Sequence, residues 1–426
     1  MDSADDKITL FANQTSEQDI FETKYKNIVI VRNASKNNLS SSKIKLKNIV
    51  DYSWEVKTYN GRLVAGHKDG KLIAYSIRAK NKGKYEGMIR IVNVENGKRA
   101  LIKGVYNETI DLEFAYLTEP VLLAYINEST LFIQKIVECN DNLETSLIFQ
   151  INDVIEHNIN HDKVTWCPYI PESTCENDLY ASQLVTWSRG TTFQCYNICF
   201  SPDGTTLAAS TEDGFVRFYQ IYLHSIDGPP RRLHEWKPHD GKAVKKILFL
   251  DNLKQNTTDE PLWKNAVTYS EELQEIKLWC CETWNCIQCI TFQNIRDIPF
   301  HLNIGIDKTA SYLILSDMNT QQVYAFCIEK CNLEEKTSFK TVIRFPVSSP
   351  ILSFDIVYAS LQRYKSSLCD TYFGQDIDEY DDETCPVLCI LKMFIVQPKS
   401  VQECNFLYCP SSTKSLNINI DLKHTN

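Results

Sequence analysis

The 426-residue sequence predicts an all-β fold, namely a β-propeller of seven blades. Short segments of alternating apolar and polar residues recur between turn residues, which is typical of strands that bury one face. One such unit occurs twice with the same layout, and no long amphipathic helix or strand–helix alternation interrupts the pattern. The length allows two or three ordinary domains or one large repeat fold, and the recurring units favour the repeat fold.

The clearest unit is YNICFSPDGTTLAASTEDGFVRFYQIY, residues 196–222. It has the layout of short strands separated by turns at residues 201–204 and 212–214. Its Asp-Gly pairs predict tight turns, because glycine accepts a positive φ and aspartate bonds back to the backbone. The residues of this unit serve to build a sheet, and none of them indicates a nucleophile, a metal cluster or a phosphate site.

An internal repeat links this unit to an earlier one. DGKLIAYSI at residues 69–77 and DGFVRFYQI at residues 213–221 both contain Asp-Gly, four residues, a tyrosine, one residue and an isoleucine. Two copies of one supersecondary unit are the signature of a repeat architecture. We therefore assign structural roles to Asp69, Tyr75, Asp213 and Tyr219.

Five weaker copies fit the same register and bring the number of predicted blades to seven. The seven equivalent positions are Tyr75, Gln134, Trp187, Tyr219, Trp279, Phe326 and Phe394. Their spacing is irregular, and since a four-stranded blade takes about 40–45 residues, the longer intervals indicate inserted loops. The interval from Trp187 to Tyr219 is too short, so one shortened or irregular blade is predicted around residues 178–200.

The domain organisation predicted from this pattern has three parts. Residues 1–24 form a disordered leader, residues 25–400 the propeller, and residues 401–426 a C-terminal tail. Propellers close by completing one blade with strands from both chain ends, which removes exposed sheet edges. YKNIVIVRN at residues 25–33 is the candidate for the strand that pairs with the final blade.

The composition predicts a non-secreted protein without a membrane span. The acidic N-terminus MDSADDKITL lacks the apolar stretch of a secretory signal. The most apolar run, residues 385–396, is too short for a bilayer, which needs about 20 residues. The 16 cysteines are therefore expected to remain thiols, buried as small apolar side chains.

Basic residues are concentrated near the N-terminus, although the net charge of the chain is −9. Residues 24–103 contain 19 Lys and Arg against 5 Asp and Glu, a local charge of +14. Such a patch fits RNA phosphates or acidic peptides. An edge strand protected by lysines explains the same pattern, so both interpretations stay open. The residues concerned are Lys43, Lys45, Lys47, Arg78, Lys80, Lys82 and Lys84.

The densest cysteine cluster, CCETWNCIQC at residues 280–289, raises the question of a metal site. Cys286 and Cys289 have the spacing that could begin a zinc site. On a regular strand, however, residues three apart point to opposite faces. No second cysteine or histidine pair follows at a suitable distance. Buried thiols are the favoured interpretation, and no metal is predicted.

No recognisable catalytic motif occurs in the sequence. A nucleophile elbow, a zinc-protease helix, a Walker loop and a dinucleotide fingerprint are all absent. His67 lies in a predicted turn and is expected to be solvated. A propeller hydrolase would need carboxylates or metal ligands that converge in the central channel, and the sequence indicates none. We therefore predict no enzyme, no catalytic residue and no cofactor.

Residues 196–222 resemble a WD40 repeat in which Tyr219-Gln220 replaces Trp-Asp. LHEWKPHDG at residues 233–241 resembles the propeller of the enhancer of mRNA-decapping family. Further segments resemble that propeller in the same order, over about residues 45–400: 49–57, 72–78, 163–172, 312–317 and 350–356. In WD40 repeats a histidine before a blade bonds to a serine or threonine, a turn aspartate and a strand tryptophan. The resemblance thus implies structural roles for His239 and Trp279.

The resemblance also implies a function. Members of this family are cytoplasmic scaffolds of processing bodies that promote mRNA decapping and decay without catalysing it. The partners implied are decapping-complex proteins, namely the catalytic subunit and its activator, bound through peptide segments. Weak RNA contact is the only nucleic-acid interaction expected, with no DNA and no membrane. The alternative is a generic WD40 adaptor in another pathway, such as ubiquitin-ligase substrate recognition.

The sequence departs from the usual layout of the family in two ways. It stops soon after the last predicted blade, without the linker and the helical C-terminal region. It also lacks a stretch that the family carries around residues 178–195, where the blade spacing is too short. The first departure bears on the bridging activity, and the second on the irregular blade.

Overall fold

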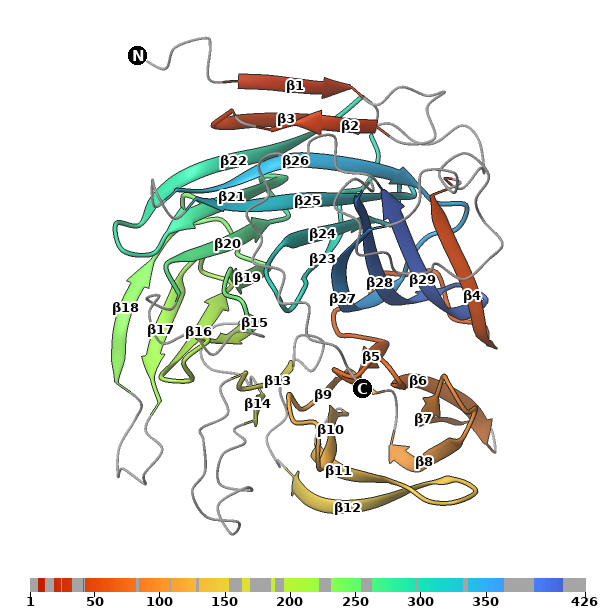
Figure 1. Ribbon diagram of the computed structural model, residues 1–426. Coiled ribbons are helices and arrows are strands. Elements are labelled where there is room, and N and C mark those ends of the chain that lie inside the picture. The colour runs from red at the N-terminus through yellow and green to blue at the C-terminus, as the bar shows by residue number, and fades with distance from the viewer. Residues whose placement is uncertain are drawn as a thin grey trace.

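The computed structural model arranges its strands around a common centre (Figure 1). The structure describes residues 7–11, 19–23, 25–32, 41, 43–81, 84–106, 109–127, 130–152, 163–168, 185–187, 195–221, 231–253, 263–295, 297–331, 336–363 and 387–408. These residues form strands, turns and loops. Among them there is no helix that could span a membrane.

The described strands form seven sheets, which we number in chain order; six have four or more strands and one has two. Sheet 1 contains β5 (Val64–Gly66), β6 (Leu72–Asn81), β7 (Lys84–Asn93) and β8 (Arg99–Tyr106). Sheet 2 contains β9 (Asp111–Phe114), β10 (Val121–Ile126), β11 (Thr130–Glu138) and β12 (Leu143–Asn152). Sheet 3 contains β13 (Val164–Trp166) and β14 (Val185–Trp187). Sheet 4 contains β15 (Cys195–Phe200), β16 (Thr206–Thr211), β17 (Val216–Gln220) and β18 (Arg232–Trp236).

The last three sheets include strands from the N-terminal part of the chain. Sheet 5 contains β19 (Lys246–Phe249), β20 (Asn265–Ser270), β21 (Glu275–Cys280) and β22 (Asn285–Asn294), extended by β3 (Asn27–Arg32) and β1 (Lys7–Phe11). Sheet 6 contains β23 (Leu302–Ile306), β24 (Tyr312–Asp317), β25 (Gln322–Cys331) and β26 (Lys336–Pro346), extended by β2 (Asp19–Glu22). Sheet 7 contains β27 (Ser353–Arg363), β28 (Val387–Gln397), β29 (Ser400–Tyr408) and β4 (Ile44–Asp51).

The sheets are arranged radially, because the first strands of neighbouring sheets contact one another. β5 lies beside β27 and β9, β13 lies between β9 and β15, and β15 lies beside β19. Apolar clusters fill the spaces between sheets, for example Phe326 and Ile290 between sheets 5 and 6, and Phe345 and Phe406 between sheets 6 and 7. The fold is an all-β propeller.

The strand that closes the ring is β4, and the prediction that residues 25–33 would do so is wrong. β4 pairs antiparallel with β29, with Leu46 opposite Cys404. β3 instead pairs parallel with β22, with Ile28 opposite Ile290. The residue patterns explain the difference. The nearly continuous apolar run of β3 suits a strand buried on both faces, whereas β4 alternates lysine with apolar residues as an outer strand does.

Two predicted boundaries also differ from the structure. Residues 1–24 were expected to be disordered, yet β1 and β2 lie within them and pair with β3 and β26. Residues 401–408 were assigned to the tail and belong to β29. β1 and β2 extend sheets 5 and 6 at their outer sides, whereas β29 lies between β28 and β4, and the blade pattern alone reveals neither arrangement.

The predicted repeat identifies the sheets, but its equivalent positions do not fall on the same strand of each sheet. The seven equivalent positions fall in seven different sheets, on β6, β11, β14, β17, β21, β25 and β28. The turn at Asp69-Gly70 precedes the second strand of sheet 1, whereas the turn at Asp213-Gly214 precedes the third strand of sheet 4. An Asp-Gly turn can close any hairpin, so it does not fix a strand's place within a blade.

The predicted irregular blade corresponds to sheet 3 and the start of sheet 4. β14 ends at Trp187, and β15, which begins at Cys195, pairs with β16 as the first strand of sheet 4. Residues 178–184 and 188–194 lie outside the described residues.

Candidate functional site

A cavity of about 370 Å³ lies where the first strands of the sheets meet. It is lined from all sides: by residues 58–62 directly before β5, and by residues of β9, β13, β15, β19, β23 and β27. Four carboxylates line it, those of Asp111, Glu113, Glu271 and Asp355. The expectation that no carboxylates converge in the central channel is therefore wrong. The missed signal is an acid alternating with apolar residues in a short inner strand, as in the DLEF of β9.

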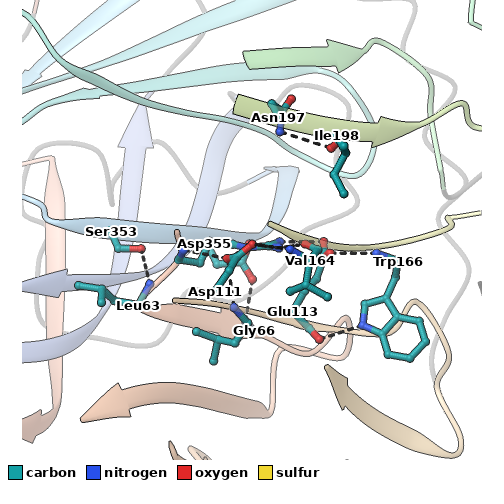
Figure 2. Close-up of polar contacts among 12 residues, drawn as sticks. Leu63, Gly66, Asp111, Glu113, Val164, Trp166, Asn197, Ile198, Ser353 and Asp355 are labelled. Atoms are coloured by element: carbon teal, nitrogen blue, oxygen red, sulfur yellow. Dashed lines mark hydrogen bonds and ion pairs between the residues drawn. The ribbon is translucent and has the colours of Figure 1, made fainter. Parts of the chain in front are cut away.

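Asp111 and Glu113 on β9 connect three sheets. The Arg62 guanidinium lies 3.0 Å from Asp111 Oδ1 and 2.8 Å from Glu113 Oε1. On the other side, the backbone N–H groups of Val164 and Trp166 each donate at 3.0 Å, to Asp111 and Glu113 respectively (Figure 2). Burial opposes ionisation of Asp111, but the charges of Arg62 and Lys163 outweigh it and hold its pKa below the usual value. These carboxylates fix sheet 2 between sheets 1 and 3.

Asp355 on β27 joins sheet 7 to sheet 1. Its Oδ2 accepts the backbone N–H of Gly66 at 2.6 Å, and Ser353 Oγ accepts that of Leu63 at 3.0 Å (Figure 2). A Cβ at Gly66 would lie only 2.9 Å from the Phe394 ring, so glycine permits this close approach. Burial raises the pKa of Asp355.

Similar bonds connect the remaining inner strands. Asn197 accepts the backbone N–H of Ile247 at 2.9 Å across sheets 4 and 5. The Tyr269 hydroxyl accepts that of Leu302 at 3.2 Å across sheets 5 and 6. Asn303 donates to the Leu352 carbonyl at 3.1 Å across sheets 6 and 7. Polar side chains of the first and second strands therefore bond to the backbone of the neighbouring sheet around much of the ring.

His239 lies at the start of a buried hydrogen-bond chain in sheet 5. Its Nδ1 lies 2.7 Å from Glu275 Oε1, and its Nε2 lies 2.8 Å from the Thr268 hydroxyl. Trp279 Nε1 donates to the same hydroxyl at 2.8 Å. Burial lowers the pKa of His239 against the opposing effect of Glu275, so the neutral ring donates to Glu275 and accepts from Thr268. The acid is a glutamate on β21, where the WD40 resemblance implied a turn aspartate.

The other assigned structural residues lie in turns and sheet interiors. Asp69 lies 3.0 Å from His67, which is only 1% exposed, so the expectation that His67 is solvated is wrong. Burial opposes ionisation of Asp69, but the nearby His67 ring and the hydrogen bond from the Lys71 backbone N–H lower its pKa to about 2. Asp213 binds Arg217 at 2.6 Å, and Tyr75 is buried on β6. Tyr219 lies half-buried on β17.

The described members of the predicted basic set lie on or beside strands of sheets 7 and 1. Lys43 precedes β4, and Lys45 and Lys47 lie on it, opposite Asn405 and Glu403. Arg78 on β6 lies 3.8 Å from Glu55 and exchanges backbone hydrogen bonds with the Tyr52 hydroxyl. Lys80 lies near the end of β6, and Lys84 is the first residue of β7; only the backbones of these two residues are described. Lys82 lies outside the described residues. Acidic residues are thus interleaved with the part of this set that the structure describes.

Cys286 and Cys289 lie on the same face of β22, contrary to the geometry expected of a regular strand. A β-bulge at Ile287 places Cys286 opposite Trp279 and Cys289 opposite Lys277. Burial raises the pKa of both thiols, that of Cys286 to about 11. Within the described ranges, no group of three side chains could hold a metal ion.

The outer strand β12 carries an apolar surface that sequence reasoning missed. Among the described residues, no other strand exposes more than one large apolar side chain. β12 exposes four, and a further one, Val137, lies on the neighbouring strand β11 opposite Glu144. The exposed fractions are 50% for Leu147, 45% for Ile148, 44% for Phe149, 36% for Ile151 and 44% for Val137. The signal for this surface is the uninterrupted apolar run at residues 147–149, which an edge strand does not need.

The likeness to solved structures supports the propeller fold. The WD40 domain of coronin from Toxoplasma gondii matches with a TM-score of 0.54 at 14% identity, covering 87% of both chains. Sqt1 from Chaetomium thermophilum matches with a TM-score of 0.51 at 9% identity, covering 87% of this chain and 99% of the other. At such identities the likeness shows the fold alone.

Similarity in sequence is more specific than the likeness of fold, because it identifies a family. Residues 40–200 and 198–332 match the family described as "WD40 region of Ge1, enhancer of mRNA-decapping protein". The "Enhancer of mRNA-decapping protein 4 homolog" of Drosophila melanogaster is 39% identical over 87% of this chain and 32% of its own length. The Homo sapiens "Enhancer of mRNA-decapping protein 4" is 31% identical over 76% of this chain and 26% of its own length. The chain thus spans a third or less of these relatives, and it belongs to the enhancer of mRNA-decapping protein family as a form of its WD40 propeller region.

Proposed function

We propose that this chain is a seven-bladed propeller that acts as a non-catalytic platform in mRNA decapping. The names of its relatives support the pathway. The contacts of the inner strands support the blade number. β13 of the two-stranded sheet lies between β9 and β15, in the same way as β5 lies between β27 and β9. In this proposal, sheet 3 is the third blade. The role places the chain in the cytoplasm, in processing bodies.

The proposal that the chain is not an enzyme rests on how the channel carboxylates are used. Arg62 and backbone N–H groups bind Asp111 and Glu113, and the N–H of Gly66 binds Asp355. A general base needs a carboxylate that is poised to accept a proton from a substrate. These carboxylates are instead engaged in holding sheets together.

The exposed apolar surface of β12 is the observation that carries the binding role. β12 is the outer strand of sheet 2 and has one edge to which no described strand is paired, so this edge can accept a further strand. The molecule already binds extended segments in this way, since β3 pairs with β22 and β2 pairs with β26. We propose that β12 binds an extended apolar segment of a decapping-complex protein, either the catalytic subunit or its activator.

Affinity capture from cytoplasmic extract tests this role. The tagged chain is expected to recover decapping subunits, and the double substitution Leu147→Lys and Phe149→Lys should abolish recovery without lowering the thermal midpoint. Leu233→Lys, at an exposed leucine on β18, is the matched control and should bind normally. Recovery of ubiquitin-ligase components instead would support the generic adaptor, and full recovery by the double variant would exclude β12 as the binding surface.

The basic residues are a proposed secondary contact that the same capture can measure. Reversal of Lys80, Lys82 and Lys84 to glutamate should reduce recovery of RNA or acidic partners, most strongly at low salt, because screening weakens contacts between exposed charges. Incubation of the purified chain with capped RNA should release no cap nucleotide. Release would contradict the non-catalytic role.

A further inference from the structure

We infer that the segment bound at β12 is an amphipathic strand of a partner protein, in which apolar and polar side chains alternate and the apolar ones lie on the side of sheet 3. This inference rests on the proposed binding role of β12 and deepens it, since it gives the bound segment its chemistry. The two faces of β12 differ in polarity from Phe149 to Asn152, and sheet 3, which packs on sheet 2, has only two described strands.

The face of β12 that is turned toward sheet 3 is apolar. Leu131 and Ile133 of β11 lie in one apolar cluster with side chains of β13. Phe149 lies directly opposite Ile133. Ile151 lies directly opposite Leu131. Residues opposite each other in a sheet share a face, so Phe149 and Ile151 are on the side of sheet 3, where both are exposed.

The opposite face of this part of β12 carries amide side chains. Gln150 lies opposite Phe132, which packs on the apolar cluster between sheets 1 and 2. Asn152 lies two residues further along the strand and therefore on the same face. Gln150 Nε2 donates to Asn152 Oδ1 at 2.8 Å. The alternation begins at Phe149, because a β-bulge at Ile148 shifts the register before it.

The described part of sheet 3 does not extend over this outer part of sheet 2. Its first strand lies beside β9 and β10, the inner strands of sheet 2. In sheet 2, residues 127–163 separate the second strand from β13 and contain both outer strands. In sheet 3, only residues 188–194 separate the second strand from β15. Two strands of about three residues and a two-residue turn already exceed this interval, so it is too short for an outer hairpin like that of sheet 2.

A strand added at the edge of β12 to which no described strand is paired meets both faces. Its alternate side chains lie about 5 Å from Phe149 and Ile151, where valine, isoleucine or aromatic side chains remove apolar surface from water. The side chains between them lie beside Gln150 and Asn152, where polar groups can bond to the amides. A uniformly apolar segment would place apolar groups beside these amides, and a uniformly polar one would leave Phe149 and Ile151 exposed. An alternating segment therefore fits β12 best.

Two designed peptides and the purified full chain test this inference. The alternating peptide is Lys-Val-Asn-Val-Asn-Val-Asn-Val-Lys, and the block peptide, Lys-Val-Val-Val-Val-Asn-Asn-Asn-Lys, has the same composition. Fluorescence anisotropy of the labelled peptides should show saturable binding of the alternating peptide. The block peptide should bind about tenfold more weakly, because it cannot match both faces of β12.

Two double variants locate the contact. Phe149→Thr with Ile151→Thr removes the apolar side chains but keeps residues suited to a strand, and it should weaken binding of the alternating peptide by about tenfold. Gln150→Ser with Asn152→Ser alters the opposite face of the same strand and is the matched control, which should bind as the wild type does. All four side chains are exposed, so the thermal midpoint should not change in either variant.

Equal affinity for the two peptides, no saturable binding of either, or wild-type binding by the variant at Phe149 and Ile151 would overturn the inference. These outcomes are distinguishable from a failure of the proposed function. Capture of decapping subunits together with equal peptide binding would retain the platform role and exclude the alternating segment. Selective peptide binding without capture of decapping subunits would support the alternating segment and exclude the decapping partner.

Discussion

Sheets 5 and 3 each contribute an inner strand to the ring but are held there by different interactions. Sheet 5 has six strands, and Arg32 of its added strand β3 forms an ion pair with Asp317 of sheet 6 at 2.7 Å, with both side chains fully buried. Sheet 3 has two described strands, and the first of them is held by backbone N–H groups that donate hydrogen bonds to Asp111 and Glu113. Polar bonds of the inner strands thus keep a sheet in place in the ring, whereas the outer strands add stability and surface.

The largest effect is expected at Arg32. Arg32→Ala would leave Asp317 buried without its ion-pair partner. It would also remove the hydrogen bond that the guanidinium donates to the Pro299 carbonyl at 3.0 Å. Breaking a buried ion pair from one side costs about 3–5 kcal/mol. Urea unfolding should show a loss of this size. Arg232→Ala, at an exposed pair with Glu235, should cost less than about 1 kcal/mol. Equal losses in the two variants would show that β3 is not a tight part of sheet 5.

A smaller and more local effect is expected at Asp111. Asp111→Ala removes the acceptor of the Val164 N–H and a partner of Arg62, whose side chain is 29% exposed. Hydrogen bonds to charged groups contribute about 1.5–3 kcal/mol each, and partial exposure reduces the total to about 2–3 kcal/mol. Hydrogen exchange should accelerate at Val164 and remain slow in β20 and β21. Acceleration throughout the ring would contradict the local role of this carboxylate.

The smallest effect is expected within sheet 5, at the hydroxyl between His239 and Trp279. Thr268→Val keeps the shape but leaves two buried nitrogens without their partner. The expected loss is about 1–2 kcal/mol, because unsatisfied buried groups cost about 1–3 kcal/mol and the ring can relax. Urea unfolding followed by tryptophan fluorescence measures it. An unchanged midpoint would show that the hydrogen-bond chain contributes no net stability.

Much of the fold could be predicted because alternation and turn residues are local. The seven equivalent positions mark seven different sheets. The hydrogen-bond chain from His239 through Thr268 to Trp279 occurs where the WD40 resemblance implied one. The closing strand could not be assigned from apolarity alone, because β3 and β4 both read as strands. Only the lysine alternation of β4 distinguishes an outer strand from the buried β3.

The cavity could not be predicted because it depends on contacts between distant residues. Asp111, Asp355 and Lys246 are separated by more than a hundred residues of sequence and meet only when the ring closes. The bulge that aligns Cys286 with Cys289 is likewise invisible in the strand pattern. The apolar run of β12 was readable in sequence, but its exposure depends on β12 being the outer strand of its sheet.

The most direct test of the account is an experimental density map of the chain, in which the sheets around the axis are counted and the partner of residues 44–51 is identified. We expect seven sheets, with residues 164–166 between β9 and β15 and residues 44–51 paired with β29. A map with fewer than seven sheets around the axis, or with residues 27–32 in place of 44–51 beside β29, would contradict it.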